Sequence, residues 1–230
     1  MRFVIALLLA AVATPAWPQT IQVEIDGASI TLALPAGHCP LERSNEADRV
    51  LIETVEKIVA ASNRVLASFA ECGQRAEYRA RKRQVLDDYG QYMTPLRGNR
   101  VNLAPADFAR QMTDVFKQQG AELMQGAEAD TRERIGALKL SIRMGETRML
   151  GVLRTDERAS YLGIVVGGTT DAGASKTLAG VTAFGAVKGR MLTLNLYSRF
   201  TEGPIGAETI IKLLEKSTQT FAATAEANRR

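Results

Sequence analysis

The sequence predicts an α+β domain, in which an antiparallel sheet of about six to seven strands has helices packed against it. Apolar and polar residues alternate over 21–25 and 29–34, the two-residue period of half-buried strands. Strand-like segments follow one another after residue 138, and the turns between them are too short for parallel crossovers. Apolar residues recur at helical spacing over 207–228, so we expect a closing helix that packs on the sheet.

Residues 1–16 have the pattern of a cleavable secretory signal peptide. Arg2 precedes an apolar run over 3–13 that is too short to span a bilayer. Small residues over 14–16 suit the positions just before a signal-peptidase cut, so the mature chain is expected to begin near Trp17. We therefore expect a periplasmic or secreted protein.

The mature chain is expected to form a single α+β domain over 17–230, with a helical insert around 40–136. It has no later apolar run long enough for a membrane span. Loss of the signal peptide removes one arginine and changes the net charge from +4 to +3. So small a charge, on an exported chain, does not predict a nucleic-acid partner.

The N-terminal elements are a hairpin and a long helix. Asp26-Gly27 joins the first two strands and is typical of a type I′ turn. Ser44 or Asn45 can cap a helix, and apolar residues at helical spacing predict that it runs over 46–71. Gly73 suits the position that follows the end of this helix.

Two cysteines, Cys39 and Cys72, predict one disulfide in an oxidising compartment. Closing a loop of this size is worth about 3.8 kcal/mol in the chain-entropy model. A helix of ~25 residues between them would be ~37 Å long. The bond therefore requires the connection over 39–45 to run back along the helix, or a bend in it, for which Asn63 is the favoured place.

The segment over 75–93 is read as a long, partly exposed strand, because Tyr78, Tyr89 and Tyr92 favour strands. It begins with a basic cluster that either protects a sheet edge or contacts an anionic partner. The candidate contact residues are Arg75, Tyr78, Arg79, Arg81, Lys82 and Arg83.

Pro105 is suited to the first turn of a second helix. The polar stretch 128–134 either extends this helix or forms a short separate one, and in both cases the helical segment is expected to end at Gly136. Five strand-like segments then follow. They are 138–144, 148–153, 161–166, 178–187 and 191–200. Residues 154–158 and Lys188-Gly189 are read as tight turns between antiparallel partners. The Gly-rich segment 167–176 is read as a connection, because its lysine is displaced from a phosphate-loop pattern and a strand follows it.

Both ends of the chain resemble the PsbP-like/DcrB-like fold group. The resemblance is carried by the N-terminal hairpin leading to LPAG at 34–37, by AVKGRMLTLNLYSRF at 186–200 and by AETIIKLLEKSTQTFAATAEAN at 207–228. It rests on the order of elements over about half the chain, not on a diagnostic motif. The resemblance implies a bacterial envelope protein with a binding, assembly or accessory role and no catalytic residues to carry over.

The sequence offers no recognisable catalytic apparatus. His38 is the only histidine, and beside a cysteine it is read as a partly exposed loop residue. Adjacent carboxylates at 87–88 and 156–157 would point apart in a strand or serve a turn, so we expect no metal and no cofactor.

These observations favour a non-enzymatic binding or accessory protein of the cell envelope that acts by contact with a protein or an anionic surface. The alternative is a small-ligand or lipid carrier, because glycines in the C-terminal strands could leave a cavity between sheet and helix. These glycines are Gly151, Gly163, Gly167, Gly168, Gly180 and Gly185. The pattern does not predict the oligomeric state.

Overall fold

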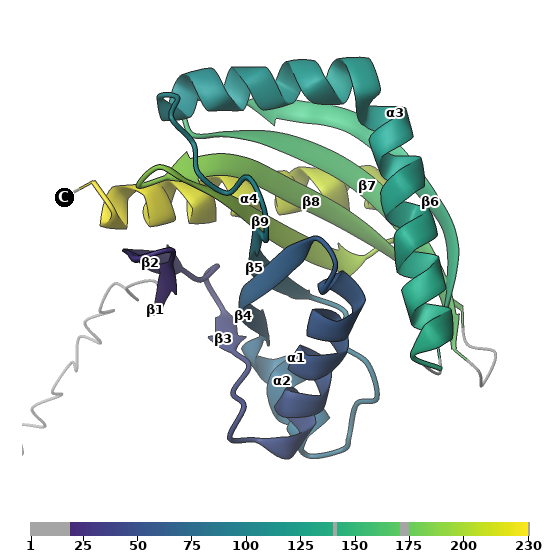
Figure 1. The fold of residues 1–230 in the computed structure, drawn as a ribbon. Helices are drawn as coiled ribbons and strands as arrows, with labels where there is room; N and C mark the ends of the chain where they lie inside the picture. The colour runs from purple at the N-terminus through teal and green to yellow at the C-terminus, as the bar shows by residue number, and fades with distance from the viewer. Residues whose placement is uncertain (1–18, 140–141, 171–174, 230) are drawn as a thin grey trace, which may run out of the picture.

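The computed structural model describes residues 19–139, 142–170 and 175–229 (Figure 1). Its centre is a seven-stranded antiparallel sheet in the order β3-β4-β5-β9-β8-β7-β6, which confirms the predicted fold class. The strands are β3 (His38–Pro40), β4 (Asn63–Glu71), β5 (Tyr89–Pro95), β6 (Ile142–Thr155), β7 (Ala159–Thr170), β8 (Ser175–Val187) and β9 (Arg190–Arg199). The predicted signal peptide lies outside the described residues.

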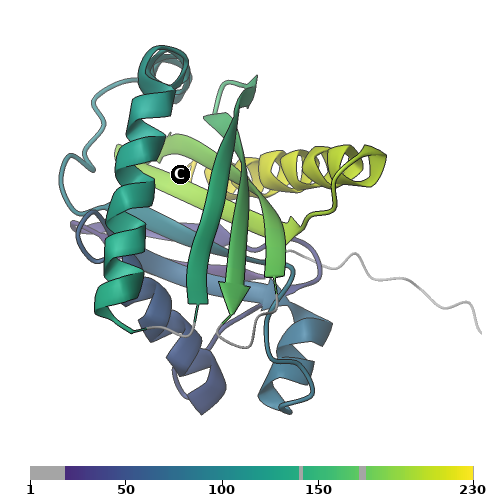
Figure 2. The ribbon, with the colours of Figure 1, turned by 90° about the vertical axis from the view of Figure 1, so that its right-hand side faces the viewer.

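Helices cover both faces of the sheet, as Figure 2 shows. Helix α4 (Pro204–Ala227) lies on one face, where it contacts β8 and β9. A separate two-stranded hairpin, β1 (Thr20–Ile25) and β2 (Ala28–Ala33), packs beside it. Helices α1 (Glu46–Val59) and α3 (Pro105–Ala137) lie on the opposite face. The short helix α2 (Cys72–Arg79) sits beside β3 and β4.

The main hydrophobic core lies between the sheet, α4 and the hairpin. Fully buried Leu194 and Leu196 of β9 meet Phe221 of α4 and Ile30 of β2 in one cluster. A side chain at Gly185 would lie 2.4 Å from the Phe221 ring, so β8 needs glycine there to let α4 approach. The sheet and the closing helix thus pack as the apolar pattern predicted.

Two turns have the backbone that their sequences predicted. Asp26 and Gly27 both have positive φ, at 46° and 78°, as a type I′ turn requires. Lys188 and Gly189 show the same pair of conformations between β8 and β9. Asn45 caps α1 by accepting a hydrogen bond from the Asp48 N–H.

The predicted helix over 46–71 is wrong in its second half. Helix α1 ends at Val59, and 63–71 forms strand β4 between β3 and β5. Val65, Leu66 and Phe69 fit a helical stripe, but the backbone gains ladder partners on both sides when it is extended. The break also removes the ~37 Å separation that a single helix would have placed between the cysteines.

The predicted strand over 75–93 is also corrected. Its first part is helix α2, because the Glu71 carboxylate accepts hydrogen bonds from the N–H groups of Gly73 and Gln74 and caps a helix there. Arg81, with φ of 58°, takes the left-handed conformation that ends the helix. Only residues 89–93 of the segment form a strand, within β5.

The segment read as a helical insert contributes strands β4 and β5, which lie between β3 and β9 in the sheet. The predicted helix from Pro105 is α3, which bends along its length (Figure 1). Leu138 and Lys139 belong to the end of that helix instead of a strand.

Residues 142–144 of one predicted strand and all of the next, 148–153, lie in the single bulged strand β6, while 140–141 lie outside the described residues. The Gly-rich segment is strand up to 170 and from 175, while 171–174 lies outside the described residues. Among the helices of the described chain, none is long and apolar enough to cross a membrane.

Candidate functional site

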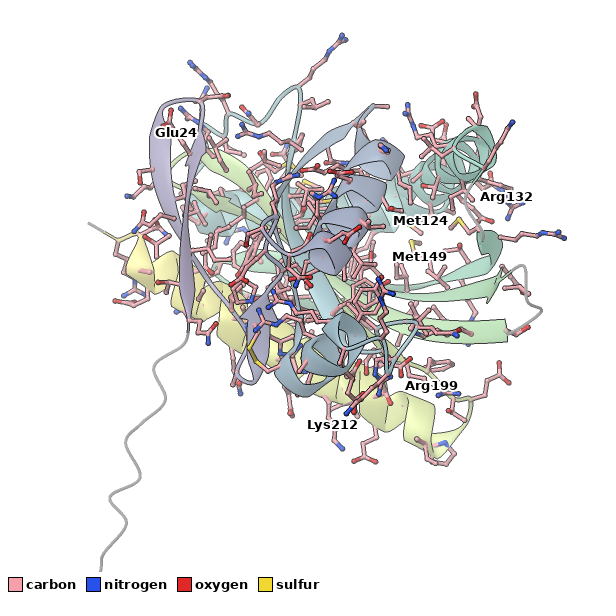
Figure 3. The ribbon with its side chains drawn as sticks, turned by 90° about the horizontal axis from the view of Figure 1, so that it is seen from below. Glu24, Met124, Arg132, Met149, Arg199 and Lys212 are labelled. Carbon is pink, nitrogen blue, oxygen red and sulfur yellow. A yellow bond between two sulfur atoms is a disulfide. The ribbon has the colours of Figure 1, made fainter. Side chains whose placement is uncertain are left out.

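A half-open groove of about 740 Å³ runs between α4 and the connection from β2 to β3. Its walls carry both apolar and polar groups, and Figure 3 shows Lys212 projecting from the α4 side. The lining residues used below are His38, Cys72, Asp88, Ser198, Lys216 and Gln219. The groove therefore contains the only histidine of the chain and one of its two cysteines.

The predicted disulfide fixes one wall of the groove. Cys39 of β3 and Cys72, the first residue of α2, are bonded, with their Cα atoms 5.0 Å apart. Cys39 pairs with Ala70 in the ladder, so the end of β4 brings Cys72 to it directly. The disulfide is confirmed, and it is compatible with an extracellular or periplasmic protein.

His38 is a buried strand residue, which corrects the expectation of a partly exposed loop position. Only 3% of its surface is accessible. Its Nδ1 lies 3.1 Å from the Ala36 carbonyl oxygen, and its Nε2 lies 3.1 Å from Oδ1 of Asp88. The other carboxylate oxygen of Asp88 accepts a hydrogen bond of 3.0 Å from Nζ of Lys216 on α4. This chain of contacts joins β3, the start of β5 and α4.

Both ring nitrogens of His38 therefore face oxygen acceptors. Burial alone would raise the pKa of the Asp88 carboxyl, but hydrogen bonds and positive charge from His38 and Lys216 hold that pKa below its ordinary value. Asp88 is then an acceptor only, and each ring nitrogen of His38 already lies against an oxygen atom of the protein. Neither nitrogen is left to take a proton from a nucleophile in the groove.

The basic cluster lies on α2 and the turn after it, and its arginines mostly serve internal contacts. Arg79 Nε lies 3.1 Å from both carboxylate oxygens of fully buried Asp48, and its Nη2 donates to Glu42 at 3.0 Å. The Asp48 and Glu42 hydrogen bonds raise the pKa of Arg79 despite partial burial. Arg75 Nη1 donates to the Pro40 carbonyl oxygen. These contacts fasten α2 to α1 and to β3.

The other four candidate contact residues have different surroundings. Arg83 pairs with Glu77 and Asp87, at 2.8 Å in each case. Tyr78 is half-buried, and burial raises the pKa of its phenol. Arg81 and Lys82 are exposed and form no ion pair with any residue that the structure describes. The six residues thus do not line the groove, and only this last pair presents unpaired charge to solvent.

The adjacent carboxylates of Asp87 and Asp88 serve different partners. Asp87 Oδ1 lies 2.7 Å from Nζ of Lys176, while Asp88 faces His38 and Lys216. Although burial alone would raise the pKa of Asp87, contacts with Lys176 and Arg83 hold it below its ordinary value. Within the described parts of the chain, acidic, histidine and cysteine side chains do not gather into a group that could hold a metal ion.

A second hollow, of about 450 Å³, lies between the start of α3 and the end of α4. Its basic side chains already have partners within the protein. Arg158 pairs with Glu157 at 2.7 Å, and Arg229 pairs with Glu226 at 2.9 Å. Lys188 donates to the Ser29 carbonyl oxygen at 3.1 Å. We therefore treat the groove as the candidate site.

At three of the glycines on which the carrier hypothesis rested, neighbouring side chains occupy the space beside the backbone. A Cβ at Gly163 would lie 2.8 Å from Leu153, and one at Gly180 would lie 2.9 Å from both Ile164 and Tyr197. The Phe221 ring fills the space at Gly185 in the same way. These glycines permit close packing instead of leaving a cavity between sheet and helix.

Sequence reasoning found the disulfide but missed most of the groove. Lys216 and Gln219 are ordinary polar residues of a helix, and nothing in their spacing distinguishes them. The sequence did carry one indication for His38. It is adjacent to Cys39, so the disulfide fixes the position of its backbone. Its partner Asp88, fifty positions along, could be found only from the sheet order.

Comparisons with known proteins add little to this picture. No protein-family model matches the chain, and no curated protein matches it. Among solved structures, the Ran-binding protein Mog1p of Saccharomyces cerevisiae aligns over 89% of this chain and 95% of that chain, with 10% identity and a TM-score of 0.39. At this level the likeness has no bearing on what the chain binds. The resemblance to the PsbP-like/DcrB-like group stays a prediction.

Proposed function

We propose that this chain is an exported, non-enzymatic binding or accessory protein of the bacterial cell envelope, which acts by contact with another protein at the α4 groove. The signal-peptide pattern of 1–16 and the Cys39–Cys72 disulfide support export. The same two observations support a periplasmic or secreted location.

The observation that carries the proposal is that both ring nitrogens of His38 are already in contact with oxygen atoms of the protein, one of them from Asp88. A histidine that serves as a base needs one nitrogen directed at the group that it deprotonates. Here one nitrogen meets a backbone carbonyl, the other meets Asp88, and the ring is buried. This arrangement holds the groove in shape without offering it a base.

The walls of the groove suit a folded or extended polypeptide. Lys212 and Lys216 are balanced by Asp88 and Glu215, so the groove has little net charge to select an anion. Apolar residues of both walls, Leu34 and Leu213 among them, also line the groove, and such a mixture is typical of protein interfaces. Because a disulfide and an ion pair already fix the walls, binding would lose little conformational entropy.

A crosslinked pull-down from the native envelope tests the proposal. Gln219→Trp fills the groove, and Gln118→Trp places the same side chain on exposed α3, on the other face of the sheet. We expect a reproducible protein partner with the natural chain and with Gln118→Trp, and loss of that partner with Gln219→Trp. Equal recovery of the partner protein with both variants would show that the groove is not the contact site.

A further inference from the structure

The hairpin has two outer edges, and the edge on β2 is closed by side chains. Asn228 accepts from the Thr31 N–H at 3.0 Å and donates to the Thr31 carbonyl oxygen at 2.7 Å. Thr224 accepts from the Ala33 N–H at 3.0 Å, and the Tyr92 hydroxyl donates to the Ala33 carbonyl oxygen at 2.9 Å. These side chains take the place of a neighbouring strand.

In the part of the chain that the structure describes, side chains do not close the edge on β1 in this way. Thr31 and Ala33 direct their main-chain groups away from β1, so their partners across the ladder, Gln22 and Thr20, direct theirs away from β2. The same alternation directs the main-chain N–H and C=O groups of Glu24 away from β2. Within the described chain, the one contact to these outward groups is from Arg64 Nη2 to the Glu24 carbonyl oxygen, at 2.9 Å.

The open edge is accessible to another chain. Thr20, Gln22 and Glu24 are exposed, and the hairpin lies at the margin of the molecule, where Figure 3 labels Glu24. Ile21 and Val23 are half-buried on the core side of the strand. An unpaired strand edge is a template for pairing with another strand.

We propose that β1 pairs antiparallel with β1 of a second copy of this chain, with Gln22 opposite the same residue of the partner. In this register Thr20 faces Glu24 of the other copy at both ends. All three positions carry outward main-chain groups, so each forms a hydrogen-bonded pair across the two-fold axis. The two hairpins then become one four-stranded sheet.

The strand complements itself in both charge and polarity. Glu24 is its only charged residue, and this register places a neutral threonine opposite it at both ends. A register with Glu24 opposite Glu24 of the second copy would place two carboxylates side by side and form fewer hydrogen-bonded residue pairs, which is unfavourable. On the core side, Ile21 would face Val23 of the second copy. Arg64 does not block the pairing, because a carbonyl oxygen can accept two hydrogen bonds.

We expect this dimer to be weak and dependent on concentration, because two six-residue strands bury little surface. The inference does not rest on the groove, since α4 closes the opposite edge of the hairpin. A monomer could therefore still bind a partner at the groove, and a dimer could form without one.

Sedimentation velocity of the mature chain over a range of concentrations tests the pairing. Gln22→Pro removes one outward N–H and leaves the inward ladder intact, while Gln22→Ala keeps that N–H. We expect reversible dimerisation of the natural chain and of Gln22→Ala, and at least tenfold weaker self-association of Gln22→Pro. Thr20→Pro is a second edge variant with the same expected effect, and thermal melting shows whether each variant folds.

Two results would overturn the proposal. One is a natural chain that stays monomeric at every concentration, including one that binds an unrelated extended peptide instead. The other is folded Gln22→Pro and Thr20→Pro variants that dimerise as well as the natural chain.

Discussion

The β3–β4 end of the seven-stranded sheet and its central β8–β9 region are held together by different kinds of interaction. At the β3–β4 end, a disulfide, the Asp48–Arg79 pair and the His38–Asp88–Lys216 contacts join several elements. In the β8–β9 region, long paired strands bury leucines and valines against α4. The β3–β4 end, the first end of the sheet, should therefore respond to reductant and acid, whereas the β8–β9 region should respond to the volume of its apolar side chains.

The largest difference is expected on removal of the disulfide. Cys39→Ser with Cys72→Ser should lower the free energy of unfolding by about 3.8 kcal/mol, because the unfolded chain regains the entropy of an open loop. Leu194→Ala in the β8–β9 region should cost about 2–5 kcal/mol through a cavity. Urea unfolding with and without reductant separates them, since reductant should weaken the Leu194→Ala chain further and leave the serine variant unchanged. A serine variant as stable as the natural chain contradicts this account.

The next effect is expected at Asp48. Asp48→Ala removes the partner of Arg79 and the acceptor of the Glu42 N–H, all at one fully buried position. We expect a loss of about 3 kcal/mol, the lower end for a broken buried pair, because part of Arg79 still reaches solvent. Arg49→Ala, at an exposed pair on the same helix, is the matched control and should change stability by less than about 1 kcal/mol. Equal effects in urea unfolding would show that burial of the pair is irrelevant.

Acid should weaken the first end through Asp87 and Asp88. Their folded pKa values lie below the ordinary value, so their stabilisation is full above the unfolded pKa and is lost as pH falls through the folded pKa. Asp88→Asn should cost about 1.5–3 kcal/mol near neutrality, the range for hydrogen bonds to charged groups. It should also flatten the decline in stability below about pH 4. Urea unfolding from pH 6 to pH 3 measures both, and an unchanged slope contradicts the assignment.

The smallest effect is expected at the exposed basic pair. Arg81→Glu with Lys82→Glu should change the free energy of unfolding by no more than about 0.5 kcal/mol, because both side chains lie at the surface without ion-pair partners in the described chain. Partner recovery in the envelope pull-down should also be unchanged. Loss of the partner in a folded variant would instead favour the anionic-contact reading of the basic cluster.

The comparison of these two regions also shows which parts of the fold can be predicted from sequence. Asp26-Gly27 and Lys188-Gly189 were predicted because turn chemistry is local. The stretch 63–71 was misread because its apolar spacing suits a helix, and only its ladders with β3 and β5 decide otherwise. In short elements near the disulfide, tertiary pairing outweighs local propensity.

The candidate site was harder to predict than the fold. Cys72 followed from the number of cysteines, but Asp88 meets His38, and Lys216 meets Asp88, only because the fold brings β3, the start of β5 and α4 together. The basic cluster stood out in sequence because its charges are adjacent, yet folding directs Arg79 and Arg83 toward acidic neighbours. Charge density along a chain therefore does not show which charges remain available to a partner.

Site-specific photo-crosslinking is the most direct test of the central claim. A photoreactive residue replaces Gln219 in the groove or, as the matched control, Gln118 on α3, and each protein is irradiated in its own envelope. We predict one defined protein adduct from position 219 and none from position 118. No adduct from position 219, or the same adducts from both positions, would contradict a contact function at this groove.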